Sequence, residues 1–372
     1  MRLRTAILVF ASCLLILSAV PCATADGSSA SVEVIGHLPN GNYRGPAVTI
    51  GHTSYIFGGR NETNVTSAII KVDLDTGAAS YAPFSLPEPR MSSSVVLDKN
   101  TSNVYIFAGS DGPFEKDTIY RFNSSQGKVE TLGVKIPHPR VGSAAAWSGR
   151  FAYLFGGHSN GTMLKEIIKF DPKTLNVTVL KAELPSGRAG MSIVTTPSGI
   201  FLFGGNTDAA CSANGALDEV LRFDPKTGNL TKMPFKTPYP FFHASGAWTG
   251  SDYYIIGGSA VKSDQNVSQV TDTIIQFNYT TSAFKMSDAK LPSPRERAAG
   301  AYLNGKAYVF GGQSGVKALD EVVAISFNDG TKTGPDTMMP VVVAMTSVLI
   351  VIALVVAWYV VKRGRDDVKK SG

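Results

Sequence analysis

Tyr55-Ile56-Phe57-Gly58-Gly59 is the stretch that decides the fold, because the chain repeats its pattern. An apolar run that closes in a pair of small residues recurs at 55–59, 105–109, 153–157, 201–205, 254–258 and 308–312. These runs follow one another at about 50 residues, a period typical of architectures built from one repeated supersecondary unit. We therefore expect six copies of one unit.

Each unit is predicted to contain four short strands. A small-residue strand such as Gly142–Trp147 comes first, and the turn Ser148-Gly149 joins it to the apolar run. A third strand ends in a turn such as Asp171-Pro172-Lys173, and a fourth strand leads toward the next unit. The glycines let neighbouring backbones approach closely, and one such sheet cannot bury both of its faces, so the units are expected to stack in a ring.

The two ends of the repeat region predict how the ring closes. The sixth unit has no fourth strand after Phe327, whereas a surplus strand, Ser31–Pro39, precedes the first unit and is similar to Phe284–Pro292. We predict that the N-terminal strand completes the sixth unit beside Val322–Phe327. A ring closed in this way has no free sheet edge.

These doublets at this period resemble the kelch-repeat family over residues 31–327. The resemblance implies an all-β fold, a six-bladed kelch-type β-propeller over residues 26–328, closed by the N-terminal strand. Two departures from the family pattern are Ala108 in place of a first glycine and the absence of the usual fourth-strand tryptophan, near which Tyr81, Val179 and Met286 stand. A fold alone does not give function.

The chain begins with a predicted signal peptide, residues 1–25. Arg2 and Arg4 precede an apolar run, and Ala23-Thr24-Ala25 has the small-residue pattern of a cleavage site. An uncleaved anchor helix is the alternative, but the apolar run is short for a membrane span.

A second apolar stretch predicts one C-terminal transmembrane helix over residues 340–361. It contains no charged residue, and Lys362, Arg363 and Arg365 follow it at once. The repeat region is therefore expected in the lumen or outside the cell as part of a single-pass type I membrane protein, with a stalk at 329–339 and a cytosolic tail at 362–372. A glycolipid-anchor signal is the rival, but it should end in its apolar tail.

Charge and cysteine content exclude several function classes. The net charge of +6 belongs mostly to the signal and the tail, so nucleic-acid binding is not expected. Cys13 and Cys22 fall in the signal, which leaves Cys211 alone and excludes a disulfide framework. The histidines are scattered without ligand spacing, so no metal and no cofactor is predicted.

Nine N-x-Ser/Thr sequons predict a glycoprotein of the secretory pathway. They begin at Asn61, Asn64, Asn100, Asn123, Asn160, Asn176, Asn229, Asn266 and Asn278.

The family resemblance implies that the loops before each first strand share one face, where many relatives bind partners. Arginines recur in these loops and could clamp carboxylates by bidentate pairing. The competing interpretation is that each arginine staples its own loop to nearby carbonyls and carboxylates. The residues predicted to contact a partner are Arg90, Arg140, Arg188, His243, Arg295 and Arg297.

The expected function is non-catalytic protein binding, with a partner that presents an acidic peptide or is a glycoprotein. The alternative is a sugar-directed enzyme of the secretory pathway, because copper radical oxidases and sialic acid mutarotases use similar propellers. A carboxylate clustered with a histidine at the channel mouth would favour the enzyme.

The C-terminus predicts a location. Lys369 and Lys370 resemble the dilysine retrieval signal of endoplasmic reticulum residents, which coat proteins bind. The alternative is an ordinary basic tail after a membrane helix, which would leave the protein at the cell surface.

Overall fold

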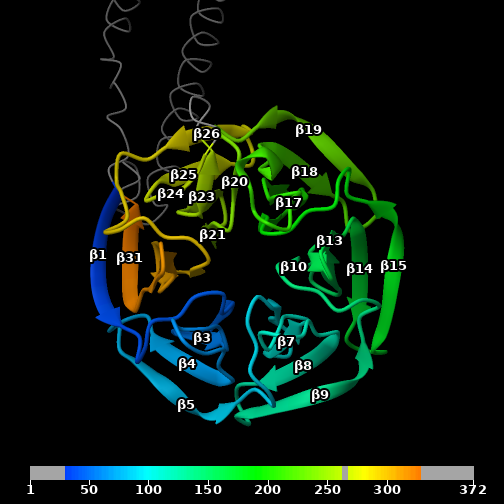
Figure 1. Ribbon diagram of the computed structural model, residues 1–372, viewed down its shortest axis with the longest axis horizontal. Coiled ribbons are helices and arrows are strands. Elements are labelled where there is room, and N and C mark those ends of the chain that lie inside the picture. The colour runs from blue at the N-terminus through cyan, green and yellow to red at the C-terminus, as the bar shows by residue number, and fades with distance from the viewer. Residues whose placement is uncertain (1–29, 262–266, 328–372) are drawn as a thin grey trace, which may run out of the picture. The chain divides into compact units, whose positions relative to one another are not determined.

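The computed structural model describes residues 30–261 and 267–327, which form one compact unit. In this part of the chain, six four-stranded antiparallel sheets lie in a ring, each with its first strand nearest the centre (Figure 1). Five of the sheets use strands in chain order. They are β2 (Ala47–Ile50), β3 (Thr53–Phe57), β4 (Ala68–Asp73) and β5 (Ala79–Ser85); β6 (Ser94–Asp98), β7 (Asn103–Phe107), β8 (Thr118–Asn123) and β9 (Lys128–Lys135); β10 (Ala144–Trp147), β11 (Ala152–Phe155), β14 (Glu166–Asp171) and β15 (Asn176–Glu183); β16 (Ser192–Thr196), β17 (Gly199–Phe203), β18 (Glu219–Phe223) and β19 (Leu230–Lys236); and β21 (Ser245–Trp248), β22 (Asp252–Ile256), β25 (Ile274–Asn278) and β26 (Ala283–Met286).

The sixth sheet joins the two ends of the repeat region. It consists of β27 (Ala299–Leu303), β28 (Lys306–Phe310), β31 (Glu321–Phe327) and β1 (Ala30–His37) as its outer strand. β1 pairs antiparallel with β31 from Ala30 opposite Phe327 to His37 opposite Glu321, so blue lies beside orange in Figure 1. The predicted closing strand and the all-β architecture are confirmed.

Short elements lie in the loops between second and third strands and, for β20 (Phe241–Phe242), in the connection between the fourth and fifth sheets. They are β12 (His158–Ser159) with β13 (Thr162–Met163), β29 (Gln313–Ser314) with β30 (Lys317–Ala318), a 3-10 turn at Ala213–Gly215, and a small sheet of β20, β23 (Ser259–Val261) and β24 (Ser268–Val270).

The small-residue pair of each unit is where neighbouring sheets meet. Its first residue has a left-handed backbone in all six copies, which explains the preference for glycine and marks Ala108 as a strained exception. The second glycine donates its N–H to a carbonyl of the next sheet, as Gly59 does to Arg90 at 2.7 Å. The last of these bonds crosses the closure, from Gly312 N to Asn42 O at 2.9 Å.

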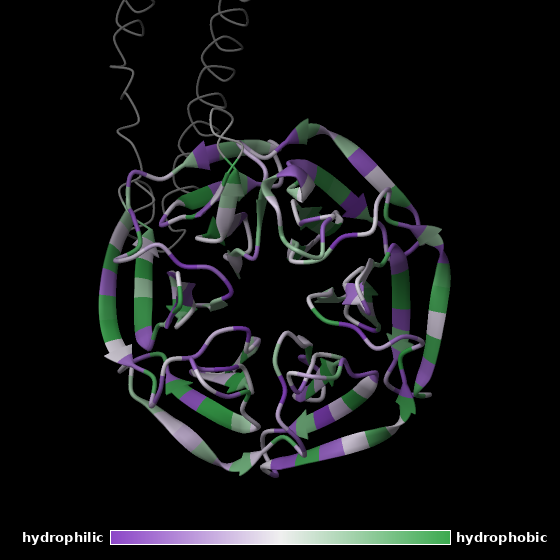
Figure 2. Cartoon of the chain, viewed as in Figure 1, coloured by the Kyte–Doolittle hydropathy of each residue, from purple (hydrophilic) through white to green (hydrophobic). Residues whose placement is uncertain are grey.

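A hydrophobic cluster fills each of the six junctions between neighbouring sheets in the ring. Figure 2 shows hydrophobic and hydrophilic residues interspersed along the outer strands, as expected for strands with one buried face. The junction across the closure contains Leu38 from the loop after β1, Val72 from β4 and Tyr308 from β28, all buried. Burying a large apolar side chain contributes roughly 1.5–3 kcal/mol, so the closure is stabilised as the other junctions are.

The ring has two different faces. Tight turns between first and second strands and between third and fourth strands lie on one face, which we call the turn face. The loops between second and third strands and the connections between sheets lie on the other, the loop face. Ala30 and Phe327 are paired at the turn-face end of the sixth sheet, so the chain enters and leaves the ring on that face.

Several predicted features lie outside the described residues: the signal peptide, the stalk, the membrane helix at 340–361, the tail with Lys369 and Lys370, and the sequon at Asn266. Residues 30–261 and 267–327 contain no helix long and apolar enough to span a membrane.

Candidate functional site

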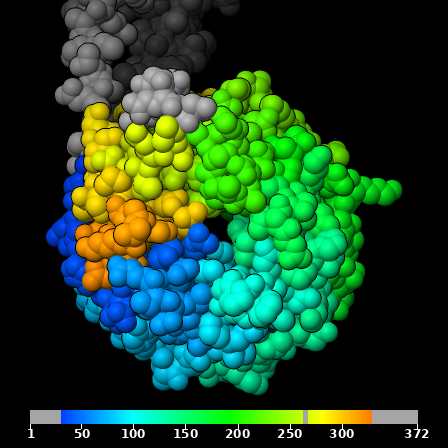
Figure 3. All heavy atoms as spheres, in the orientation of Figure 1, coloured from blue at the N-terminus to red at the C-terminus, as the bar shows by residue number. Residues whose placement is uncertain are grey.

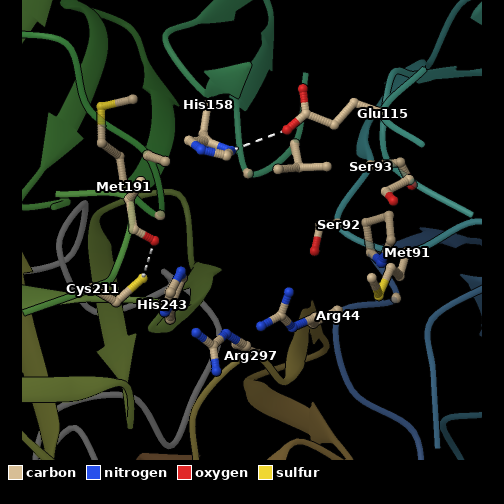
Figure 4. Close-up of a pocket in the computed structure, with 18 of the residues that line it drawn as sticks. Arg44, Met91, Ser92, Ser93, Glu115, His158, Met191, Cys211, His243 and Arg297 are labelled. Carbon is tan, nitrogen blue, oxygen red and sulfur yellow. Dashed lines mark hydrogen bonds and ion pairs between the residues drawn. The ribbon is translucent and has the colours of Figure 1, made fainter. Parts of the chain in front are cut away.

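A cavity of about 450 Å³ opens on the loop face at the mouth of the central channel. Every sheet contributes to its wall through the segment before its first strand, and three sheets add residues from the loops after their second strands. Figure 3 shows the central opening, and Figure 4 shows the side chains around it.

A closed circle of backbone hydrogen bonds encircles the channel here. Each of the six residues just before the first strands donates its N–H to the carbonyl of the equivalent residue in the preceding sheet, at 2.7–3.0 Å, and the first donates to the last. All six have left-handed backbones. We call these residues the channel ring: Arg44, Ser92, Gly142, Gly190, His243 and Arg297.

The side chains of the channel ring are unevenly distributed. Two consecutive positions are glycine, whereas His243, Arg297 and Arg44 follow one another around the circle. Figure 4 shows these three on one side of the opening, with Cys211 beside them. The cavity therefore has one basic side.

Glu296 lies behind this basic side and holds two of its members. Its carboxylate accepts hydrogen bonds from Arg297 Nη1 at 2.5 Å and Ser259 Oγ at 2.7 Å, and His243 Nδ1 lies 3.4 Å away. Burial alone would raise the pKa of Glu296, but the adjacent His243 imidazole and the charge of Arg297 outweigh it and lower the pKa to about 2. Burial lowers the pKa of His243 to about 4, so His243 is neutral at ordinary pH.

Arg44 differs from Arg297 because no carboxylate forms an ion pair with it. Among the described residues its side chain has no ion-pair partner, and its buried Nε has no hydrogen-bond acceptor. Burial, and then the nearby charge of Arg297, lower the pKa of Arg44 to about 10. The guanidinium stays charged at neutral pH and lines the cavity.

The opposite side of the cavity carries a second histidine–carboxylate pair. His158 Nδ1 lies 3.1 Å from Glu115 Oε1, and Glu115 Oε2 accepts a hydrogen bond from the backbone N–H of Asn160 at 3.0 Å. Ser93 also lines the cavity, and its buried Oγ has no hydrogen-bond partner among the described residues. Apolar wall is supplied by Met91, Met163 and Met191.

Four of the predicted contact residues do not reach the cavity. Arg90, Arg140, Arg188 and Arg295 are at most 1% exposed. Arg140, for example, donates to the carbonyl of Gly156 at 3.0 Å and to Glu166 at 2.6 Å, and the other three also pair with glutamates. These contacts are those of the competing interpretation, in which each arginine holds its own loop in place. The four arginines therefore do not line the cavity. His243 and Arg297, the other two residues predicted to contact a partner, line the cavity.

Arg44 does not occupy a staple position, although it too is an arginine in a loop before a first strand. The staple position of the first sheet belongs to Asn42, whose Nδ2 donates to Gly58 O at 2.8 Å across 16 residues, the separation of Arg140 from Gly156. Arg44 stands two residues later, in the position of Arg297. The number of residues between each arginine and the following glycine pair would have distinguished the staple positions from the positions two residues later.

Cys211 lines the cavity without the surroundings of a nucleophile. Burial raises the pKa of its thiol, which lowers the thiolate fraction. Within the described part of the chain, no three His, Cys, Asp or Glu side chains are grouped so that they could hold a metal ion.

The sequon asparagines lie at the surface. Of the eight in the described residues none is buried, and five are exposed: Asn64, Asn100, Asn160, Asn176 and Asn229. Asn123 and Asn278 are less free, because their Nδ2 atoms donate to Asn103 and Asp252.

Comparisons with known proteins agree with this architecture. A family model described as the KLHDC2/KLHL20/DRC7 Kelch-repeats domain matches residues 46–258, more than half of the chain. A solved structure titled "Structure of YjhT" superposes with a TM-score of 0.65 at 17% sequence identity, covering 80% of this chain and 98% of that chain. A search of curated proteins found no match.

Proposed function

The chain belongs to the Kelch-repeat family, and from this premise we propose that it is a membrane-anchored propeller of six blades that binds a protein partner on its loop face without catalysis. The observation that carries the proposal is the cavity, which is walled by all six sheets and is lined by an arginine whose Nε has no hydrogen-bond partner among the described residues. Kelch-repeat domains generally mediate protein binding, which supports this function.

The surface around the cavity supports a protein partner. The three most exposed large apolar side chains among the described residues are Val316, Phe114 and Val267, and all three stand in loops of the loop face. Apolar contacts around a polar pocket are a common composition for a protein interface.

Anchoring and lumenal location are supported by the sequence. The signal peptide, the apolar stretch at 340–361 and the surface sequons are consistent with one topology. Ala30 and Phe327, the ends of the described ring, lie on the turn face, so neither end occupies the loop face to which the proposal assigns the partner.

A sugar-directed enzyme is the second candidate, because the channel mouth does contain histidines beside carboxylates. His158–Glu115 is the pair that favours it. His243–Glu296 does not, since pKa values of about 4 and 2 lie far from neutrality, where a general acid or base works best.

Chemical cross-linking of the full-length glycoprotein in cells, followed by purification and mass spectrometry, tests the binding function. The double variant Phe114→Glu/Val316→Glu should lose the partner, and Arg150→Glu on the turn face should retain it. Magnetisation exchange between sugar anomers, measured by NMR with the purified protein, tests the enzyme. If the protein accelerates the exchange and Glu115→Gln abolishes this acceleration, the protein is an enzyme and the proposed non-catalytic binding function is wrong.

We also propose that the protein resides in the endoplasmic reticulum through Lys369 and Lys370, in contact with coat protein. The alternative location is the cell surface.

A further inference from the structure

Arg44 is the feature of the cavity that its own chain leaves incomplete. Arg44 is partly buried, and no carboxylate forms an ion pair with it among the described residues. Charged and polar groups shielded from solvent are normally paired or hydrogen-bonded. Here the Arg44 Nε is buried without an acceptor, and a second buried donor, the Ser93 hydroxyl, also lacks a partner among the described residues. Both side chains line the same cavity, with the Arg44 guanidinium directed into it (Figure 4).

We propose that Arg44 is the centre of a subsite for a single carboxylate group, presented by the protein partner, with Ser93 as an additional donor. This proposal rests on the proposed binding function and names the chemical group that the cavity recognises. A guanidinium offers paired N–H donors whose geometry matches a carboxylate.

The charges around the cavity favour a monoanion. Arg297 is hydrogen-bonded to Glu296, and Glu115 lies beside His158, so Arg44 is the arginine of this cavity without an ion-pair partner among the side chains that the structure describes. A phosphate dianion would add a second negative charge near Glu115 and Glu296, which like-charge repulsion disfavours. A cavity of about 450 Å³ admits a carboxylate side chain with part of its neighbours.

A carboxylate subsite at Arg44 predicts opposite effects of its removal on the stability of the free protein and on binding, which an arginine with a purely structural role would not show. If the carboxylate is the missing partner, Arg44 destabilises the free protein and strengthens the complex. Arg44→Met keeps much of the side-chain volume and removes the charge. It should therefore raise the melting temperature of the free protein and weaken carboxylate binding, a trade-off typical of functional sites.

The test uses the full-length glycoprotein in detergent micelles, with calorimetric titration and thermal unfolding. The probes are a short peptide blocked at both ends with a central glutamate, the same peptide with glutamine, sodium acetate and inorganic phosphate. The glutamate peptide should bind, and the glutamine peptide should bind about tenfold more weakly or worse, because the charge-assisted pair is lost. Arg44→Met should cause a similar loss, whereas Arg150→Met, an equal charge change at an exposed turn-face position, should leave binding unchanged.

Each outcome decides between the alternatives. Binding of acetate without binding of the peptide would support the carboxylate subsite and assign it to a small acid, against a protein partner. Tighter binding of phosphate than of acetate would overturn the choice of a monoanion. A destabilised Arg44→Met protein that binds the glutamate peptide normally would overturn the subsite, while the cross-linking experiment would still decide whether the loop face binds a protein.

Discussion

Single residues in this propeller divide into those that hold sheets together and those that line the cavity, although the sequence presents both as arginines in similar loops. Arg140 and Arg297 show the difference. The first is buried against Gly156 and Glu166, whereas the second lies two residues later in its own loop and lines the cavity. The role of each arginine depends on its separation in sequence from the glycine pair of its unit. Whether the side chain is buried is a property of the folded structure, so a sequence motif alone does not give it.

Gly190 gives a residue-scale prediction about His243. A Cβ on Gly190 would lie 2.6 Å from His243 Cδ2, whereas on Gly142 the nearest atom would be Ala189 Cβ at 3.4 Å. Both glycines have left-handed backbones, so both alanine variants carry a similar backbone strain of about 1 kcal/mol. Gly190→Ala should in addition displace the His243 ring and reduce partner binding. Denaturant unfolding and cross-linking check this, and equal behaviour of the two variants would contradict the packing described.

His243 also predicts a pH dependence of stability. Its pKa in the folded protein is about 4, below the ordinary value of 6.5, because burial disfavours the charged ring. The contribution of the neutral His243 ring to the free energy of unfolding is therefore fully present above pH 6.5. It is lost as the pH falls from 6.5 toward 4, because in this range the unfolded chain takes up a proton that the folded protein does not. The loss should be on the order of 3 kcal/mol.

Urea unfolding of the wild type and His243→Gln at several pH values measures this loss. The variant should have a flatter profile between pH 6.5 and 4. Below 4.5 both should weaken, because the pKa of Glu296 is depressed to about 2. Parallel profiles over the upper range would show that His243 is not buried as described.

At the scale of elements, β1 is the piece on which ring closure depends. It pairs with β31 and also touches the first sheet, where a Cβ on Gly36 would lie 2.1 Å from the carbonyl oxygen of Gly77. The outer strand of the sixth sheet is therefore packed against a turn of its neighbour, as closure requires.

Gly36→Ala should consequently weaken the closure. Gly133 in β9 is a matched control, because it too lies in an outer strand but a Cβ there would have no neighbour within 4 Å. We expect Gly36→Ala to lower the free energy of unfolding by about 1–3 kcal/mol and Gly133→Ala to leave it nearly unchanged. Thermal unfolding of both variants measures the difference, and a reversed order of stabilities would speak against closure by β1.

The repeat made these elements predictable from sequence, because its period, its glycine pairs and the surplus strand Ser31–Pro39 each specify a local structure. One element is shorter than expected: β26 ends at Met286, although Phe284–Pro292 was compared with a full fourth strand. The channel ring could not be predicted, since Gly142, Ser92 and His243 share a backbone conformation and a position but no side-chain chemistry.

At the scale of the whole molecule, we propose a glycosylated, anchored ring that presents one face to a partner. Digestion with an N-glycosidase should lower the apparent mass by several glycans, while a reducing agent should leave the monomer's mobility unchanged, because Cys211 is the one cysteine in the described part of the chain and has no disulfide partner there. Removing the exposed sequons Asn64, Asn100, Asn160, Asn176 and Asn229 should account for most of the shift. Mobility unaffected by the glycosidase would contradict a lumenal ring.

The tail predicts where the molecule is found. If Lys369 and Lys370 act in retrieval, the glycans should be sensitive to endoglycosidase H. Replacing both lysines by serine should give resistant glycans at the cell surface. Lys362, Arg363 and Arg365 still follow the apolar stretch, so the orientation should not change. A wild-type protein already at the surface would make the tail a topology signal alone.

The central claim, that a protein partner docks on the loop face over the Arg44 cavity, is tested most directly by site-specific photo-cross-linking in cells. A photoreactive residue is placed at Val316, which is 91% exposed on the loop face, or at Arg150 on the turn face. The account predicts a discrete protein adduct from position 316 that Arg44→Met reduces, and none of that mass from position 150. The same adduct from position 150, or an adduct from 316 that Arg44→Met leaves unchanged, would contradict it.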